Sequence, residues 1–94
     1  MPDIVAGTGR TYLLTVDHTE NEVTLCNTIN TFMIRVVSGE SVKLWFPTDT
    51  SGNYWTMQVG DSPLGPIYTN SGTTLKLQTA IGVITSQVEI IGWG

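Results

Sequence analysis

The sequence contains few of the residues that reinforce small domains chemically. Its 94 residues include one cysteine, Cys26, and one histidine, His18. A single cysteine excludes a disulfide within the chain, and this pair of residues offers no spacing typical of a structural zinc site. A chain of this length removes only about 60 to 65% of its unfolded surface from water on folding. Association with other copies is therefore the obvious remaining source of stability.

Charge is also scarce. Charged residues make up 13% of the chain, about half of the usual share in a soluble domain. The net charge is −4, from eight acidic and four basic residues. The bases Arg10, Arg35, Lys43 and Lys76 are far apart in the sequence, and none belongs to a basic run. Because nucleic-acid binding depends on clustered positive charge near the phosphates, we expect no nucleic-acid partner.

Long hydrophobic runs are missing as well. No stretch of about 18 apolar residues occurs, so we expect no membrane-spanning helix and no membrane partner. The N-terminal segment MPDIVAGTGR carries an acid, Asp3, where a signal peptide carries bases, and no long apolar core follows it. We therefore expect the protein to be synthesised in the cytoplasm of its host without the secretion machinery.

The residues that are present favour β-strands. Hydrophobic residues make up 40% of the chain, and threonine, which favours strands, occurs 15 times. Apolar and polar residues alternate over short runs that are separated by Gly, Asn, Asp and Pro, and no window has the period of a helix. The expected strands are 11–16, 22–26, 31–37, 41–46, 54–59, 66–69, 73–78, 81–85 and 86–93, the last two being compatible with one bent strand or a hairpin.

This even spacing of short strands predicts an all-β fold, namely a single-domain antiparallel β-sandwich of jelly-roll type. Glycine-containing turns at 38–39, 51–53 and 70–72 and a loop at 60–66 with two prolines support the breaks between strands. We expect the β-sandwich domain to span residues 11–94, preceded by an N-terminal arm at 1–10.

Several of the expected strands are apolar on both faces. In 31–37, Phe32, Ile34 and Val36 share one face, and other apolar residues lie opposite them. A two-layer sandwich covers only one face of each strand, so the second face requires another cover. Scattered exposed apolar groups are the alternative explanation. We expect a self-association surface, with the terminal strand held in a sheet or against another subunit; its predicted residues are Met33, Val37, Ile90, Ile91 and Trp93.

Residues suited to catalysis or metal binding are few. His18 lies among Asp17, Glu20 and Glu22, a set that suits a divalent-cation loop or an ordinary solvated turn. Cys26 follows in an alternating stretch, where cysteine commonly acts as a small buried hydrophobe. No third group that would orient a Cys/His pair is evident. We expect no enzymatic activity and no cofactor.

The aromatic residues suggest a second kind of function. A tyrosine beside a turn can stack on a sugar ring while its hydroxyl stays in water. Neighbouring amides would supply hydrogen bonds to the ligand. The sequence predicts a carbohydrate-binding platform made of Tyr54, Tyr68, Asn53 and Asn70.

Two resemblances to known families add to these predictions. The stretch SGESVKLWFPTDTSGNYWTM, at 38–57, resembles the first inhibitory loop of chagasin-type cysteine protease inhibitors, with altered spacing. The resemblance implies a protease-binding loop, although the glycine-rich second loop and the Arg-Pro-Trp third loop of that family do not occur here. The residues in the matching places are Pro47, Thr48, Thr50, Gly52, Tyr54 and Trp55.

The second resemblance covers nearly the whole chain. A threonine-rich strand, TNSGTTLKLQ, is followed by a closing apolar strand that ends in IIGWG. Together with the low charge, this resembles the small β domains of tailed-bacteriophage virions: capsid decoration (cement) proteins and the tips of fibres or tail needles. The chain has no long stalk sequence before this domain, which favours the decoration type.

This resemblance implies a homotrimer in the virion that bridges subunits of the viral capsid protein and stabilises the head. A fibre tip that binds a host receptor or glycan is the alternative. The N-terminal arm would reach across to a capsid subunit and become ordered on binding. The expected arm contacts are Asp3, Ile4, Val5 and Arg10.

Overall fold

The described part of the protein is built entirely from β-strands. The computed structural model describes residues 9–69 and 72–94, so the predicted arm residues Asp3, Ile4 and Val5 and the platform residue Asn70 lie outside the described residues. The strands in these ranges are β1 (Arg10–Val16), β2 (Asn21–Thr24), β3 (Thr31–Ser38), β4 (Val42–Trp45), β5 (Trp55–Met57), β6 (Leu64–Tyr68), β7 (Thr74–Thr79) and β8 (Ser86–Trp93). The all-β prediction is confirmed.

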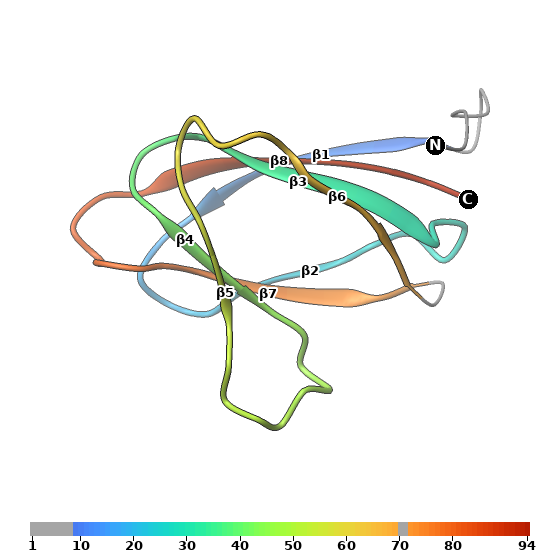
Figure 1. The fold of residues 1–94 in the computed structure, drawn as a ribbon, viewed down its shortest axis with the longest axis horizontal. Helices are drawn as coiled ribbons and strands as arrows, with labels where there is room; N and C mark the ends of the chain where they lie inside the picture. The colour runs from blue at the N-terminus through green and yellow to red at the C-terminus, as the bar shows by residue number, and fades with distance from the viewer. Residues whose placement is uncertain (1–8, 70–71) are drawn as a thin grey trace.

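The strands form two antiparallel sheets of four strands each, an arrangement compatible with the predicted β-sandwich (Figure 1). Sheet A has the order β1-β8-β3-β6, and sheet B has the order β2-β7-β4-β5. The chain pairs its halves in a nested way: β1 with β8, β2 with β7, β3 with β6 and β4 with β5. β8 also pairs with β3, so the terminal strand lies inside sheet A rather than at its edge.

The core lies between the sheets and follows from the alternation of each strand. In β3, Phe32, Ile34 and Val36 are buried as predicted, while Arg35 and Val37 on the other face are exposed. Removing such side chains from water stabilises the fold by roughly 25 cal/mol per Å² of apolar area. The buried cluster consists of Val16, Leu25, Ile29, Phe32, Ile34, Val36, Val42, Leu44, Met57, Leu75, Leu77, Val88 and Ile90.

One expected strand is wrong. Residues 81–85 do not form a strand but belong to the loop between the end of β7 at Thr79 and the start of β8 at Ser86. Gly82 in this loop has a φ of +86°, a left-handed conformation that glycine adopts readily and β-branched residues avoid. The short apolar run therefore turns the chain from one sheet to the other.

Candidate functional site

The predicted self-association residues separate into buried and accessible ones. Ile90 belongs to the core, and Trp93 is only 2% exposed. The assignment of these two side chains to a subunit contact is corrected, because both are already buried within a single chain. Met33 and Ile91 are half-buried, and Val37 is exposed. These three remain accessible to a partner.

Met33 and Ile91 lie side by side on the outer face of sheet A. The register places Ile91 opposite Met33 on β3 and opposite Thr11 on β1. Leu13, on the same face of β1, is 70% exposed. These strands border a hollow of about 540 Å³, which we call the outer hollow; it is lined by Thr11, Tyr12, Leu13, Met33, Ile34, Arg35, Pro63, Glu89, Ile90 and Ile91.

The charged residues of the outer hollow neutralise each other. Arg35 on β3 lies opposite Glu89 on β8, and its Nε donates a hydrogen bond of 2.8 Å to Glu89 Oε1. The second contact, from the Arg35 Nη2 to the same oxygen, measures 2.6 Å. An exposed ion pair of this kind contributes little to stability. Its effect here is to leave the hollow without an unpaired charge.

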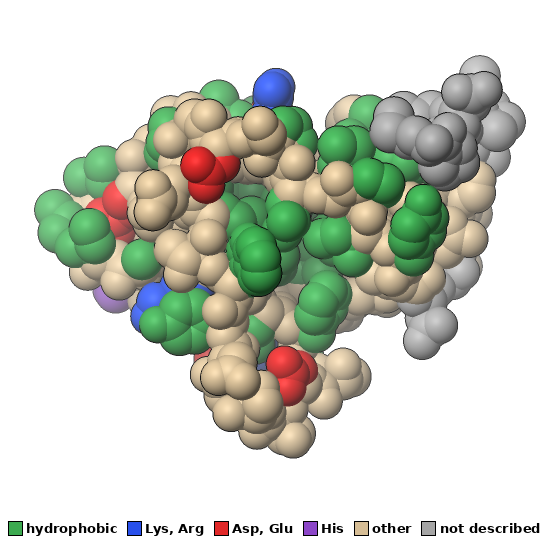
Figure 2. Space-filling model, in the orientation of Figure 1, with side chains coloured by type: hydrophobic (Ala, Val, Ile, Leu, Met, Phe, Trp, Pro, Cys, Tyr) green, Lys and Arg blue, Asp and Glu red, His purple; other side chains and the backbone are tan. Residues whose placement is uncertain are grey.

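A second apolar surface lies in the β7–β8 loop. Ile81, Val83 and Ile84 are 73%, 78% and 54% exposed; we call these three residues the apolar tip. Figure 2 shows hydrophobic side chains gathered at the end of the molecule where Figure 1 draws this loop. Sequence reasoning missed this surface because it assigned the run to a strand. Gly82 within an otherwise apolar run was the available signal for a turn.

The apolar tip is held by the turn between β3 and β4. The Glu40 carboxylate accepts a hydrogen bond of 2.6 Å from the backbone N–H of Gly82. Burial would raise the pKa of Glu40, but hydrogen bonds from the backbone N–H groups of Gly82, Val83 and Ile84 lower it below its usual value. The Ala80 N–H also donates to the Ser41 carbonyl at 2.8 Å. These bonds give the N–H groups of Ala80 and Gly82 partners and connect the loop to the β3–β4 turn.

Sheet B carries a smaller, more polar hollow of about 380 Å³, which we call the polar hollow. Tyr54 lies in it with its ring 4.5 Å from the Lys43 Nζ, a cation–π contact that orients the ring. The Asp49 carboxylate accepts the Ser51 N–H at 3.0 Å and shapes the adjoining loop. The lining residues are Glu20, Lys43, Trp45, Asp49, Thr50, Gly52, Asn53, Tyr54 and Gln78.

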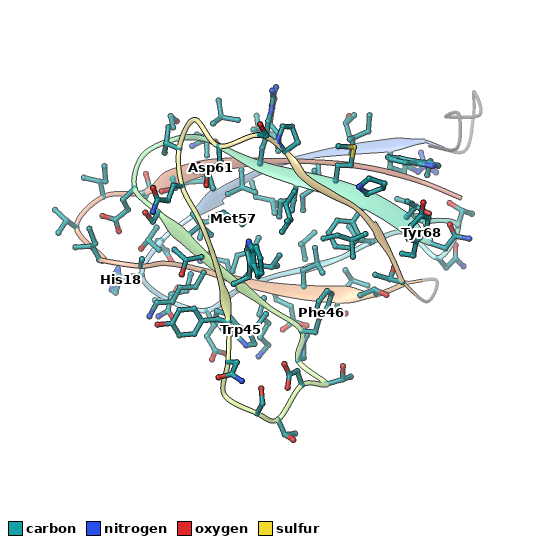
Figure 3. The ribbon with its side chains drawn as sticks, viewed as in Figure 1. His18, Trp45, Phe46, Met57, Asp61 and Tyr68 are labelled. Atoms are coloured by element: carbon teal, nitrogen blue, oxygen red, sulfur yellow. The ribbon has the colours of Figure 1, made fainter. Side chains whose placement is uncertain are left out.

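The predicted carbohydrate platform is thus brought together only in part. Tyr54 and Asn53 both line the polar hollow, but Tyr68 belongs to β6 of sheet A and does not line it. Figure 3 shows Tyr68 well apart from Trp45, which does line the hollow. Trp45 is an aromatic residue that the predicted platform omitted.

The segment around His18, for which the sequence left open a cation loop or a solvated turn, is a hydrogen-bonded turn. The Asp17 carboxylate accepts hydrogen bonds from the Thr19 hydroxyl, the Thr19 N–H and the Asn21 amide, which lower the pKa of Asp17 to about 2. Glu20 pairs with Lys76 at 3.0 Å. Within the described ranges, no group of three or more His, Cys, Asp or Glu residues could hold a metal ion.

Cys26 and His18 lie at opposite ends of β2, so they do not form a catalytic pair. Figure 3 shows His18 beside the β7–β8 loop.

The Cys26 sulfur accepts a hydrogen bond of 3.3 Å from the Thr28 hydroxyl. The Thr28 hydroxyl and N–H, followed by the Arg10 side chain, lower the pKa of Cys26 to about 7.

The segment that resembles a protease-inhibitor loop joins β4 to β5. It protrudes from the body of the sandwich (Figure 1), and its residues from 47 to 55 are exposed.

Among the residues that the structure describes, no helix is long and apolar enough to span a membrane. No protein-family model matches the chain, and a search of curated proteins finds no match to it.

Proposed function

We propose that the protein is a homo-oligomeric structural protein of a virion, of the capsid-decoration type, and that its fold is a jelly roll. The nested pairing of the two halves of the chain supports a jelly roll, an eight-stranded fold that occurs in viral capsid and lectin domains. In this proposal the protein is a homotrimer that bridges capsid subunits. Arg10, at the start of β1 opposite Gly92, marks where the proposed capsid-contacting arm leaves sheet A.

The observation that carries the proposal is the outer hollow. Leu13, Met33 and Ile91 bring apolar side chains together on a sheet face that no described segment of the chain covers. Apolar hollows of this kind on soluble proteins mark interaction sites. Another copy of the chain is the proposed occupant, since a 94-residue domain with one cysteine lacks the disulfides and metals that reinforce small domains.

Measurement of the solution mass tests this proposal. The chain mass is 10.2 kDa, and light scattering should report a multiple of it, three times for a homotrimer. Leu13→Glu should reduce the mass to that of one chain, because it places a charge in the apolar contact. Thr15→Glu is a matched control on the same face of β1, outside the outer hollow. A wild-type protein with the mass of one chain at all concentrations would contradict the proposal.

The polar hollow favours carbohydrate binding as a second candidate function. Its volume of about 380 Å³ falls within the roughly 300–1,000 Å³ of typical small-molecule sites. Trp45 and Tyr54 supply aromatic rings for stacking, and Asn53 and Gln78 supply hydrogen-bonding amides.

A glycan array with wild-type protein tests this candidate. Tyr54→Ala should abolish retention, while Tyr68→Ala, which changes another exposed tyrosine that lies outside the hollow, should preserve it. An array on which the wild-type protein binds no glycan would contradict the hypothesis.

A further inference from the structure

We propose that the apolar tip of one copy inserts into the outer hollow of the next copy. This inference rests on the proposed function, because it names the surface that fills the proposed contact between copies. The chain carries an apolar projection, Ile81, Val83 and Ile84, and an apolar depression around Leu13, Met33 and Ile91. The two surfaces share no residue.

The apolar tip is prepared for insertion by its hydrogen bonds. The Gly82 N–H is already bonded to the Glu40 carboxylate at 2.6 Å, and the Ala80 N–H to the Ser41 carbonyl at 2.8 Å. Burying a polar group without a partner is costly. Because these donors have partners within the chain, the loop can enter an apolar site without losing hydrogen bonds to water at these positions.

The loop is also fixed in place before it binds. Ser86 Oγ accepts the Glu40 N–H at 2.8 Å and donates to the Glu40 carbonyl at 2.7 Å. Gly39 in the same turn packs so closely that a Cβ there would lie 2.6 Å from the Ser86 Cα. A loop that is already ordered loses little conformational entropy on association.

The outer hollow suits an aliphatic occupant. Leu13, Met33, Pro63 and Ile91 are apolar, and the Arg35 charge is balanced by Glu89 at 2.6 Å. An inserted aliphatic loop therefore meets no unpaired charge, whereas a charged segment would have to be desolvated without a free counter-ion.

The positions of the two surfaces determine the kind of assembly. The loop that carries the apolar tip lies at one end of the sandwich (Figure 1). The outer hollow is lined by residues of β1, β3 and β8 in sheet A, so one copy can insert its tip and receive another. Such a contact is heterologous and generates a ring when the rotation between copies closes. The proposed homotrimer is one such ring.

Disulfide trapping tests the pairing directly. In a Cys26→Ser background, which has no other cysteine, Val83→Cys and Leu13→Cys are made as separate proteins and mixed under mild oxidation. A covalent dimer should form in the mixture and in neither protein alone. A mixture of Val83→Cys with Val59→Cys, an exposed position that lines neither surface, is the control and should stay uncrosslinked. Dimers of Val83→Cys or Leu13→Cys alone would overturn the proposal, because they would indicate a two-fold contact.

Charge substitutions separate this inference from the proposed function. Val83→Lys should weaken assembly about tenfold or more, as measured by sedimentation, and mixing it with Leu13→Glu should restore complexes between the two variants. An oligomer that forms normally with Val83→Lys but not with Leu13→Glu would overturn the inference and leave the proposed function intact. A wild-type chain that never assembles would overturn both.

Discussion

Ser86 Oγ forms two hydrogen bonds with the backbone of Glu40, accepting its N–H at 2.8 Å and donating to its carbonyl at 2.7 Å. Ser86 is fully buried, so its hydroxyl is not in contact with solvent. This one side chain connects the β3–β4 turn to the first residue of β8. The pair joins sheet A, which contains β3 and β8, to the turn that leads into β4 of sheet B.

Substitution of Ser86 with alanine should therefore destabilise the fold. It leaves the part-buried N–H and carbonyl of Glu40 without their partner, at a cost of about 1–3 kcal/mol. Urea unfolding followed by circular dichroism measures the change, with Ser62→Ala, at an exposed loop position, as the control. Equal stability of Ser86→Ala and Ser62→Ala would show that the Glu40 backbone finds other partners.

Glu40 should make the stability of the β7–β8 loop depend on pH. Its folded-state pKa is lowered because its carboxylate accepts hydrogen bonds from the loop backbone. A lowered pKa stabilises the folded state above the unfolded-state pKa, and this contribution is lost as the pH falls through the folded-state value. A free glutamate carboxyl group has a pKa of 4.5, so the loss should occur below that pH.

Glu40→Gln isolates this effect, because glutamine keeps an acceptor oxygen but does not titrate there. Stability curves measured from neutral pH downward should fall less steeply for Glu40→Gln than for the wild type below about pH 4.5. Superimposable slopes in this acidic range would contradict the assigned role of the carboxylate.

Cys26 should react with alkylating agents at neutral pH. Its pKa is about 7 because the Thr28 hydroxyl and N–H stabilise the thiolate, and the thiolate is the reactive form. Thr28→Val should raise the apparent pKa toward the value of a free cysteine, as read from the pH dependence of the iodoacetamide rate. Thr24→Val, whose hydroxyl instead contacts Thr74 at 2.9 Å, should leave the profile unchanged. A wild-type profile centred on the free-cysteine value would refute the prediction.

Gly92 should tolerate no larger residue without strain. A Cβ at this position would lie 2.7 Å from Cγ2 and 3.1 Å from Cδ1 of Ile29, which is fully buried. Gly92→Ala should cost roughly 1–3 kcal/mol through overpacking, measured by chemical unfolding. The cost should shrink in an Ile29→Ala background, since the clashing atoms are gone. An undiminished cost in that background would place the strain elsewhere.

The sequence by itself determined the inner face of each long strand. Phe32, Ile34 and Val36 alternate with Met33, Arg35 and Val37, and a period of two leaves only one way to bury the first set. It also predicted a second apolar surface with Met33, Val37 and Ile91, but it assigned the buried Ile90 and Trp93 to the same surface. At 81–85 Gly82 signalled a turn, but the apolar residues around it have the same local pattern in a short strand and in a loop, so the run was assigned to a strand.

Only the tertiary structure decided which apolar residues stay accessible. Trp93 and Ile81 are both large and apolar in sequence, yet Trp93 at the end of β8 is buried, whereas Ile81 is exposed in the loop that connects β7 of sheet B to β8 of sheet A. Likewise, Tyr54 and Tyr68 both adjoin turns, but Tyr54 precedes β5 of sheet B, whereas Tyr68 ends β6 of sheet A. Alternation is a local property that fixes the face of a strand, whereas exposure and proximity depend on which distant strands pair.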